Sequence, residues 1–156
     1  MLIVGCGCRG RELARDLIAK GHAVRGTTRD PAGLPEIEAA GAEAVVADPD
    51  RLGTLVGHLQ GVAVVCWLLG DVTGAAAADL HGPRLRTMLE RLVDTPVRGV
   101  VYEAAGRAGS DVLADGGAAV REAAATWSIP AEVVGEDPVD RPAWLASMST
   151  AVGRLL

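Results

Sequence analysis

Apolar residues along the chain alternate between short runs and positions spaced as on one face of a helix. The runs predict strands over residues 2–4, 22–28, 42–48, 62–69, 97–102 and 130–134. Residues 62–69, VAVVCWLL, are so continuously apolar that they suit a central parallel strand covered on both faces. Helical spacing between the runs predicts one helix that ends at Lys20-Gly21 and others over residues 31–41, 50–61, 83–94 and 118–127.

Several boundaries and connections carry further expectations. Asp50 is predicted to cap the helix that follows it, and Pro83 to begin the next one. Residues 70–82 fit a loop and a frayed helix equally, whereas residues 106–117 are predicted to be a flexible connection. The C-terminal tail carries a helical apolar stripe that either seals the core or forms the seam of a homodimer: Trp144, Leu145, Met148, Val152 and Leu155.

Alternating strands and helices with short connections imply a parallel sheet covered by helices, because right-handed crossovers place a helix over each strand pair. We therefore expect an α/β fold of three layers, built on a doubly wound, Rossmann-like parallel sheet of about six strands. A closed eight-stranded barrel would need about 200 or more residues, and this chain has 156. The length also predicts a single domain over residues 1–156.

Composition and charge exclude several classes of partner. The net charge is −5 and the basic residues are scattered, which argues against nucleic acid and against an acidic membrane surface. No apolar run approaches the roughly 18–20 residues of a membrane span, and no basic region followed by a removable apolar segment begins the chain. We therefore expect a cytoplasmic protein whose three cysteines stay reduced.

A glycine pattern, Gly5-x-Gly7-x-x-Gly10, separates the first predicted strand from the first predicted helix. In that position Gly5 permits a tight turn, Gly7 lets a pyrophosphate approach the backbone, and Gly10 lets the helix pack closely on the strand. The free amides and the positive end of the helix then face the phosphates. We expect a dinucleotide to bind here; the alternative is a structural turn in a fold that binds no such ligand.

The end of the second predicted strand indicates which dinucleotide binds. NAD sites place an acidic residue there, about 20 positions beyond the glycines, to hold the ribose hydroxyls. This chain has Thr28 at that position and Arg29 after it, and a hydroxyl with a guanidinium suits a 2′-phosphate. NADP is therefore the expected cofactor and NAD the alternative. Asp30, followed by Pro31, is expected to cap the next helix.

The glycine loop contains two further candidate cofactor ligands, Cys8 and Arg9. Arg9 either reaches a phosphate or remains a solvated surface arginine. A thiol at a helix N-terminus loses its proton more readily than a free thiol, so Cys6 or Cys8 is a candidate reactive cysteine. No metal site is expected, because the three histidines lack metal-ligand spacing and the two loop cysteines have no second pair.

Two segments, VGCGCRGRELARDLIAKGHAVRGTTRDP and GAEAVVADPDRLGTLVGHLQGVAVVCWLLG, resemble the N-terminal half of atypical and extended short-chain dehydrogenase/reductases. The resemblance covers about residues 1–106 and is to the NAD(P)-binding branch similar to sugar-nucleotide epimerases. It implies that Asp48 touches the adenine and that Leu68, Leu69 and Gly70 line the ribose region of the cofactor. From the residues alone, a helix-capping role for Asp48 fits equally well.

The catalytic residues of that family do not stand at their expected places. Its members transfer protons with a Ser or Thr after the fifth strand and a Tyr-x-x-x-Lys pair, in which the lysine lowers the pKa of the tyrosine. Here Gly106 stands where the lysine should follow Tyr102, and the single lysine, Lys20, lies in the first helix. Tyr102 is predicted to pack near the edge of the sheet. Glu103 is the one carboxylate there with an acid–base position, although we expect it to be exposed to solvent.

Two functions fit these residues. The first is a single-domain NADP-binding protein that binds the cofactor or senses its state without the standard catalytic relay. It is favoured by the missing relay and by the few residues, about 20, that remain for a substrate lobe after the sixth strand. The second is an NADP-dependent oxidoreductase or nucleotide-sugar epimerase whose nonstandard site is completed by a partner subunit. A flavin-binding protein or a scaffold without ligand is the third alternative.

Overall fold

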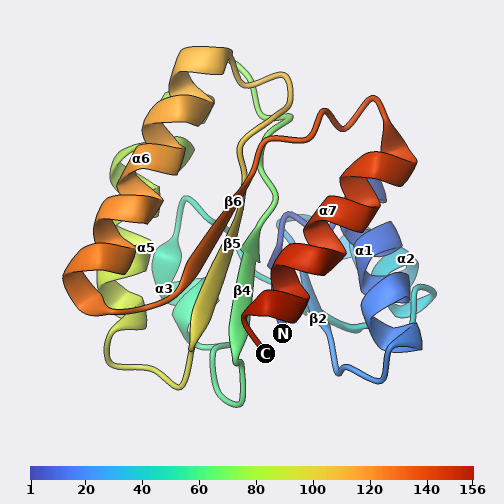
Figure 1. The fold of residues 1–156 in the computed structure, drawn as a ribbon. Coiled ribbons are helices and arrows are strands. Elements are labelled where there is room, and N and C mark those ends of the chain that lie inside the picture. Colours follow the sequence, from blue (N-terminus) through green and yellow to red (C-terminus); the bar gives the residue numbers. More distant parts are fainter.

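The computed structural model describes all 156 residues and contains one six-stranded parallel sheet (Figure 1). The strands are β1 (Leu2–Val4), β2 (Arg25–Thr28), β3 (Glu43–Val46), β4 (Val64–Trp67), β5 (Gly99–Glu103) and β6 (Ala131–Val134). Their spatial order is β3-β2-β1-β4-β5-β6, and every neighbouring pair is parallel. The chain therefore winds outward from β1 in one direction and, from β4, in the other, which confirms the predicted doubly wound sheet.

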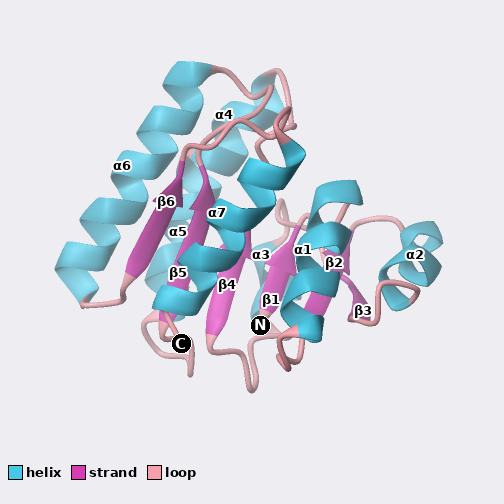
Figure 2. Cartoon of the chain, turned by 45° about the vertical axis from the view of Figure 1, so that its right-hand side comes forward, coloured by secondary structure: helices cyan, strands magenta, loops and turns pink.

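Helices cover both faces of the sheet and make the three expected layers (Figure 2). They are α1 (Cys8–Ala19), α2 (Leu34–Glu38), α3 (Leu52–Val56), α4 (Ala75–His81), α5 (Pro83–Leu92), α6 (Ser110–Trp127) and α7 (Arg141–Arg154), with a 3-10 turn, η1 (Pro31–Gly33). One apolar core lies between the sheet and α3, α4, α5 and α6, and the other lies between the sheet and α1, α2 and α7. None of these helices combines the length and the apolar character that a membrane span requires.

Side chains of the central strands alternate between the two cores, as the two-residue period of a strand requires. Val65 and Trp67 of β4 face the core beneath α5, and Val64 and Cys66 face the core beneath α1 and α7. All four are buried, because helices cover both faces of β4. The continuous apolar run that predicted a central parallel strand is thereby explained.

The C-terminal helix seals the second core. Trp144, Met148 and Val152 are completely buried against α1 and the sheet, and Leu145 and Leu155 pack at the margin of the same core. Of the two alternatives for this stripe, the structure shows the sealing role. A homodimer seam through the same residues would require them to be exposed, and their own chain covers them.

Two local predictions are wrong. Residues 110–117, expected to be part of a flexible connection, form the first two turns of α6, because Gly116 lets the helix lie close to Tyr102. A Cβ at Gly116 would stand 2.1 Å from the Tyr102 hydroxyl, so close packing overrides the low helix propensity of glycine. Asp50 does not cap α3: that helix begins at Leu52 without a side-chain cap, and it ends at Val56.

Candidate functional site

A crevice lies at the carboxyl ends of β1 and β4, the two strands from which the chain winds in opposite directions. The connection after β1 leads toward β2, whereas the connection after β4 leads toward β5, so the two loops diverge. Ligands of open α/β folds bind at such a switch point. The glycine loop follows β1 directly and therefore lies in this crevice.

The three glycines of the loop differ in what surrounds them. Gly5 has a φ of +81°, and a Cβ there would lie 2.5 Å from the Leu68 carbonyl oxygen, so the turn after β1 requires glycine. Gly10 lies where α1 crosses β1, since a Cβ would stand 3.1 Å from the Gly5 carbonyl oxygen and 3.3 Å from the Ile3 side chain. A Cβ at Gly7 would meet no atom within 4 Å. The outer glycines thus serve packing, whereas the middle glycine faces open space.

The N-terminus of α1 has backbone donors without protein acceptors. Gly7 is the residue before the helix and makes no side-chain cap. The amides of Cys8, Arg9 and Gly10 donate to no other protein group, while the Gly7 amide is bonded to the Gly5 carbonyl oxygen at 2.8 Å. Unpaired amides at a helix N-terminus, together with the helix dipole, form a site that favours an anion.

Two cavities meet at the glycine loop, and Gly5 and Gly7 line both. The first has a volume of about 280 Å³ and lies toward β2 and β3. It is lined by Gly5, Cys6, Gly7, Arg11, Thr27, Thr28, Arg29, Gly33, Ala47, Pro49 and Leu69. The second has a volume of about 190 Å³ and is lined by Gly5, Gly7, Cys8, Arg9, Gly10, Leu68, Asp71 and Arg141. An elongated ligand that crosses Gly7 would fill one cavity with each end.

The first cavity has two arginines and no carboxylate in its lining. Arg29 is exposed and lies 3.8 Å from an Asp50 carboxylate oxygen, whereas Arg11 forms a 2.8 Å ion pair with the exposed Glu36. Arg11 was not among the candidate residues expected from the sequence. The available signal was its position directly after Gly10, in the first turns of the helix that the glycine loop begins.

Thr28 and Asp30 shape the turn beside these arginines. The Asp30 carboxylate accepts a 2.9 Å hydrogen bond from the Ala32 amide, which confirms the predicted cap. The Thr28 hydroxyl lines the first cavity and bonds to the backbone of Asp30, donating to its carbonyl oxygen at 3.0 Å. Asp30 itself is absent from the cavity lining, because its carboxylate is turned into the cap.

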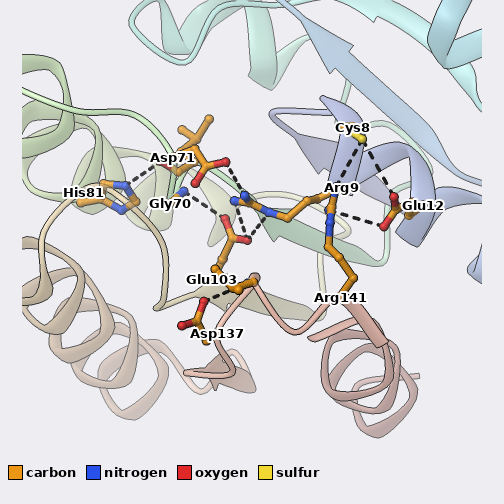
Figure 3. A network of polar contacts seen from close by, with 11 residues as sticks. Cys8, Arg9, Glu12, Gly70, Asp71, His81, Glu103, Asp137 and Arg141 are labelled. Carbon is orange, nitrogen blue, oxygen red and sulfur yellow. Dashed lines mark hydrogen bonds and ion pairs between the residues drawn. The ribbon is translucent and has the colours of Figure 1, made fainter. Parts of the chain in front are cut away.

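Arg9 forms ion pairs within the protein. Its guanidinium pairs with Glu103 at 3.0 Å and with Asp71 (Figure 3). It also lies 5.8 Å above the Trp144 ring. Only 15% of the side chain is exposed. Arg9 is therefore not a solvated surface residue: it lines the second cavity, and its guanidinium is paired with two carboxylates.

Glu103 is completely buried, so the expected exposure to solvent is wrong. One carboxylate oxygen accepts from Arg9, and the other accepts a 3.0 Å hydrogen bond from the Gly70 amide. Burial raises the pKa of Glu103 above its usual range, although the Arg9 charge and the Gly70 amide partly offset that effect. The carboxylate joins the glycine loop to the loop after β4.

The residues implied by the family resemblance occupy different places around the crevice. Leu69 lines the first cavity and Leu68 the second, while Gly70 is bound to Glu103. Asp48 does not line either cavity, although its neighbour Pro49 lines the first. The Asp48 carboxylate accepts a 3.0 Å hydrogen bond from the Asp50 amide, so Asp48 precedes α3 without capping it, because the residue at the N-cap of that helix is Arg51.

Tyr102 lies in the core and not near the edge of the sheet. It belongs to β5, one strand in from the edge, and is completely buried. Its hydroxyl lies 2.7 Å from His81 Nδ1, and His81 Nε2 lies 3.1 Å from the Leu69 carbonyl oxygen. Burial lowers the pKa of His81, so the neutral ring can accept from Tyr102 and donate to Leu69. Tyr102 lines neither cavity.

The two loop cysteines differ in accessibility. Cys6 is buried, and burial raises the pKa of its thiol to about 11, which disfavours the thiolate that a reactive Cys6 would need. Cys8 is exposed and lines the second cavity. No group of three or more His, Cys, Asp or Glu side chains is arranged to hold a metal ion.

Comparisons with known proteins agree with this architecture. A family model described as NAD(P)H-binding matches residues 5–129, which end before β6 and α7. No curated protein sequence matches the chain. A protein from Bacillus halodurans assigned as an NAD-dependent epimerase/dehydratase has a similar solved structure, with a TM-score of 0.73 at 19% identity. That match covers 88% of this chain and 69% of the other.

Two further solved structures are similar over most of this chain. A variant of UDP-glucuronic acid 4-epimerase from Bacillus cereus, in complex with NAD and UDP-4-deoxy-4-fluoro-glucuronic acid, has a TM-score of 0.69 at 14% identity, covering 85% of this chain and 54% of its own. Triphenylmethane reductase from Citrobacter sp., complexed with NADP(H), has a TM-score of 0.61 at 16% identity, covering 85% and 47%. This chain thus spans about half the length of those two proteins, and at these identities the similarity establishes the fold.

Proposed function

This chain belongs to the NAD(P)H-binding family, and on that premise we propose that it binds NADP(H) across the two cavities. The adenosine half occupies the cavity beside β2, and the pyrophosphate crosses Gly7 at the N-terminus of α1. The nicotinamide half extends toward Leu68 and Asp71. The shared lining of the cavities and the unpaired amides of α1 support this placement.

The preference for NADP rests on one observation: two arginines and no carboxylate line the adenosine-side cavity. A ribose 2′-phosphate there would meet Arg11 and Arg29, with the Thr28 hydroxyl beside them. Guanidinium groups bind phosphate through charge-assisted hydrogen bonds, whereas a carboxylate at this place would repel it. Both arginines have partners only in exposed or distant carboxylates, so a phosphate can compete for them.

We further propose that residues 1–156 act as one dinucleotide-binding domain that binds the cofactor or senses its state without the Tyr-Lys proton relay. Tyr102 supports this proposal, because its hydroxyl is buried against His81. Lys20 supports it as well, because its ammonium is bonded to Asp16 at the other end of α1. The alternative is a reductase or an epimerase with a nonstandard site. Steady NADPH oxidation with a carbonyl or sugar-nucleotide substrate, abolished by Gly7→Ala, would favour that alternative.

Calorimetric titration of NADPH and NADH tests the cofactor preference. Arg29→Ala and Arg11→Ala should each weaken NADPH binding by about tenfold, since a charged hydrogen bond contributes about 1.5–3 kcal/mol. Both variants should leave NADH binding nearly unchanged. Arg91→Ala is the matched control, because Arg91 is exposed in the last turn of α5, on another part of the molecule. An unaltered NADPH-to-NADH ratio in both cavity variants would contradict the assignment.

A further inference from the structure

The second cavity has two arginines in its wall, and they differ in how many of their N–H donors already have protein acceptors. Arg9 directs Nε and Nη2 to Glu103 and Nη1 to Asp71, so all three guanidinium nitrogens have carboxylate partners. Its charge is opposed by two carboxylates. Arg9 therefore has little capacity left for a ligand in the cavity.

Arg141 reaches the same wall from the first turn of α7 (Figure 3). Its Nη2 donates to the Cys8 thiol sulfur at 3.3 Å, which is a weak acceptor. Its Nη1 lies 3.4 Å from a Glu12 carboxylate oxygen, within ion-pair range, but that buried nitrogen makes no hydrogen bond. Both contacts join α7 to the N-terminal half of α1, where the unpaired amides lie.

We propose that Arg141 binds the pyrophosphate of the dinucleotide and thereby completes a site that the glycine loop alone leaves open. This inference rests on the proposed function and names the cation that acts on the cofactor's two linked phosphates. A short rotation of the side chain from Glu12 toward the cavity would exchange a weak contact for charge-assisted hydrogen bonds to phosphate oxygens. Arg141, and not the loop residue Arg9, then neutralises the cofactor at this end of α1.

The surrounding charges explain why this arginine matters. Asp71 lines the second cavity, while Glu103 and Glu12 pair with the two arginines of its wall. Without Arg141, Arg9 would be the one cation left in that lining. A pyrophosphate would then enter a region with an excess of carboxylates. With Arg141 present, two cations oppose three carboxylates, and the helix amides supply the remaining positive field.

The test uses the full chain and three ligands: NADPH, NADH and adenosine 2′-phosphate, which lacks the pyrophosphate. Arg141→Ala should weaken NADPH and NADH by the same factor, about tenfold or more, and leave adenosine 2′-phosphate unchanged. Glu12→Gln should leave dinucleotide affinity unchanged or increase it, because it releases Arg141. The matched control is Arg154→Ala, since Arg154 lies in the same helix and has one 3.2 Å ion pair, with Glu132. Thermal unfolding establishes that each variant is folded.

The outcomes separate this inference from the proposed function. If wild-type protein binds NADPH and folded Arg141→Ala binds it within twofold of wild type, the role of Arg141 is refuted while the proposed function stands. Equal weakening of adenosine 2′-phosphate would also refute it, because the effect would then not depend on the pyrophosphate. If the wild-type chain binds neither dinucleotide, the proposed function fails, and the inference fails with it.

Discussion

Replacing Gly7 by alanine should weaken cofactor binding strongly without unfolding the protein. The residue has φ −73° and ψ −156°, an extended conformation that alanine adopts without strain, and its methyl group would meet no atom within 4 Å. Alanine is a poorer residue than glycine at a helix N-cap. It also lowers the entropy of the unfolded chain, which stabilises the folded state by a similar amount, about 0.4–1 kcal/mol. The free energy of unfolding should therefore change by less than about 1 kcal/mol.

The same methyl group would stand where we propose that the pyrophosphate approaches the backbone. Phosphates pushed away from α1 lose their hydrogen bonds to the amides that follow Gly7, and each bond to a charged group contributes about 1.5–3 kcal/mol. Loss of one or two such bonds corresponds to a drop in affinity of at least about tenfold and up to about 10⁴-fold. NADPH and NADH should be affected equally, because both contain the pyrophosphate.

Gly5→Ala is the matched comparison within the same loop. Its φ of +81° costs a residue with a side chain about 1–2 kcal/mol. The new Cβ would also lie 2.5 Å from the Leu68 carbonyl oxygen and 2.7 Å from the Leu69 side chain. This overlap would destabilise the folded state by about a further 1–3 kcal/mol. Gly5→Ala should therefore lower the free energy of unfolding by about 2–5 kcal/mol.

Urea unfolding measures the stability of both variants, and calorimetric titration measures their affinity for NADPH. The expected pattern is a stable Gly7→Ala protein that binds NADPH at least about tenfold more weakly than wild type and a destabilised Gly5→Ala protein. If folded Gly7→Ala bound NADPH as tightly as wild type, the phosphates would not lie at the glycine loop, and the reasoning would be refuted. A loss of stability in Gly7→Ala as large as that in Gly5→Ala would refute the distinction drawn between the two glycines.

Three further predictions concern the core and the thiols. Burial lowers the pKa of His81 in the folded state, so the free energy of unfolding should be constant above about pH 6.5. At lower pH it should decrease by up to about 1.4 kcal/mol per pH unit, as measured by urea unfolding. His81→Gln should flatten this profile, and an identical slope in the variant would contradict the assignment. Gly116→Ala should lower the free energy of unfolding by about 2 kcal/mol, because its methyl group would overlap the Tyr102 hydroxyl; wild-type stability would disprove that contact. Iodoacetamide should modify exposed Cys8 and spare buried Cys6, with NADPH slowing the reaction in peptide mass spectrometry; equal modification of both thiols would count against the burial of Cys6.

The sequence pattern was sufficient to predict the elements that are specified by residues close together in the chain. Apolar runs located the six strands, and the glycine spacing located the loop between β1 and α1. Where the prediction failed, a distant contact decided the outcome. Residues 110–117 form a helix because Gly116 packs on Tyr102, a contact that no local pattern contains.

The candidate site divides in the same way. Gly5, Gly7 and Gly10 could be assigned separate roles from their spacing, because the turn, the open backbone and the helix crossing all lie within six consecutive residues. The partners of the charged residues could not be assigned. Arg9 meets Glu103 from 94 positions away, and Arg141 meets Cys8 from 133 positions away.

The sequence by itself therefore determined the order of strands and helices and the position of the glycine loop before α1, since periodicity and turn chemistry act over a few residues. Only the tertiary structure decided which arginines face the cavities, and why Glu103 is buried. Those outcomes depend on the order of strands in the sheet, which brings the carboxyl ends of β1, β4 and β5 together and allows α7 to pack beside α1. Ion pairing then follows from this proximity, because a buried carboxylate is stable only beside a cation and hydrogen-bond donors.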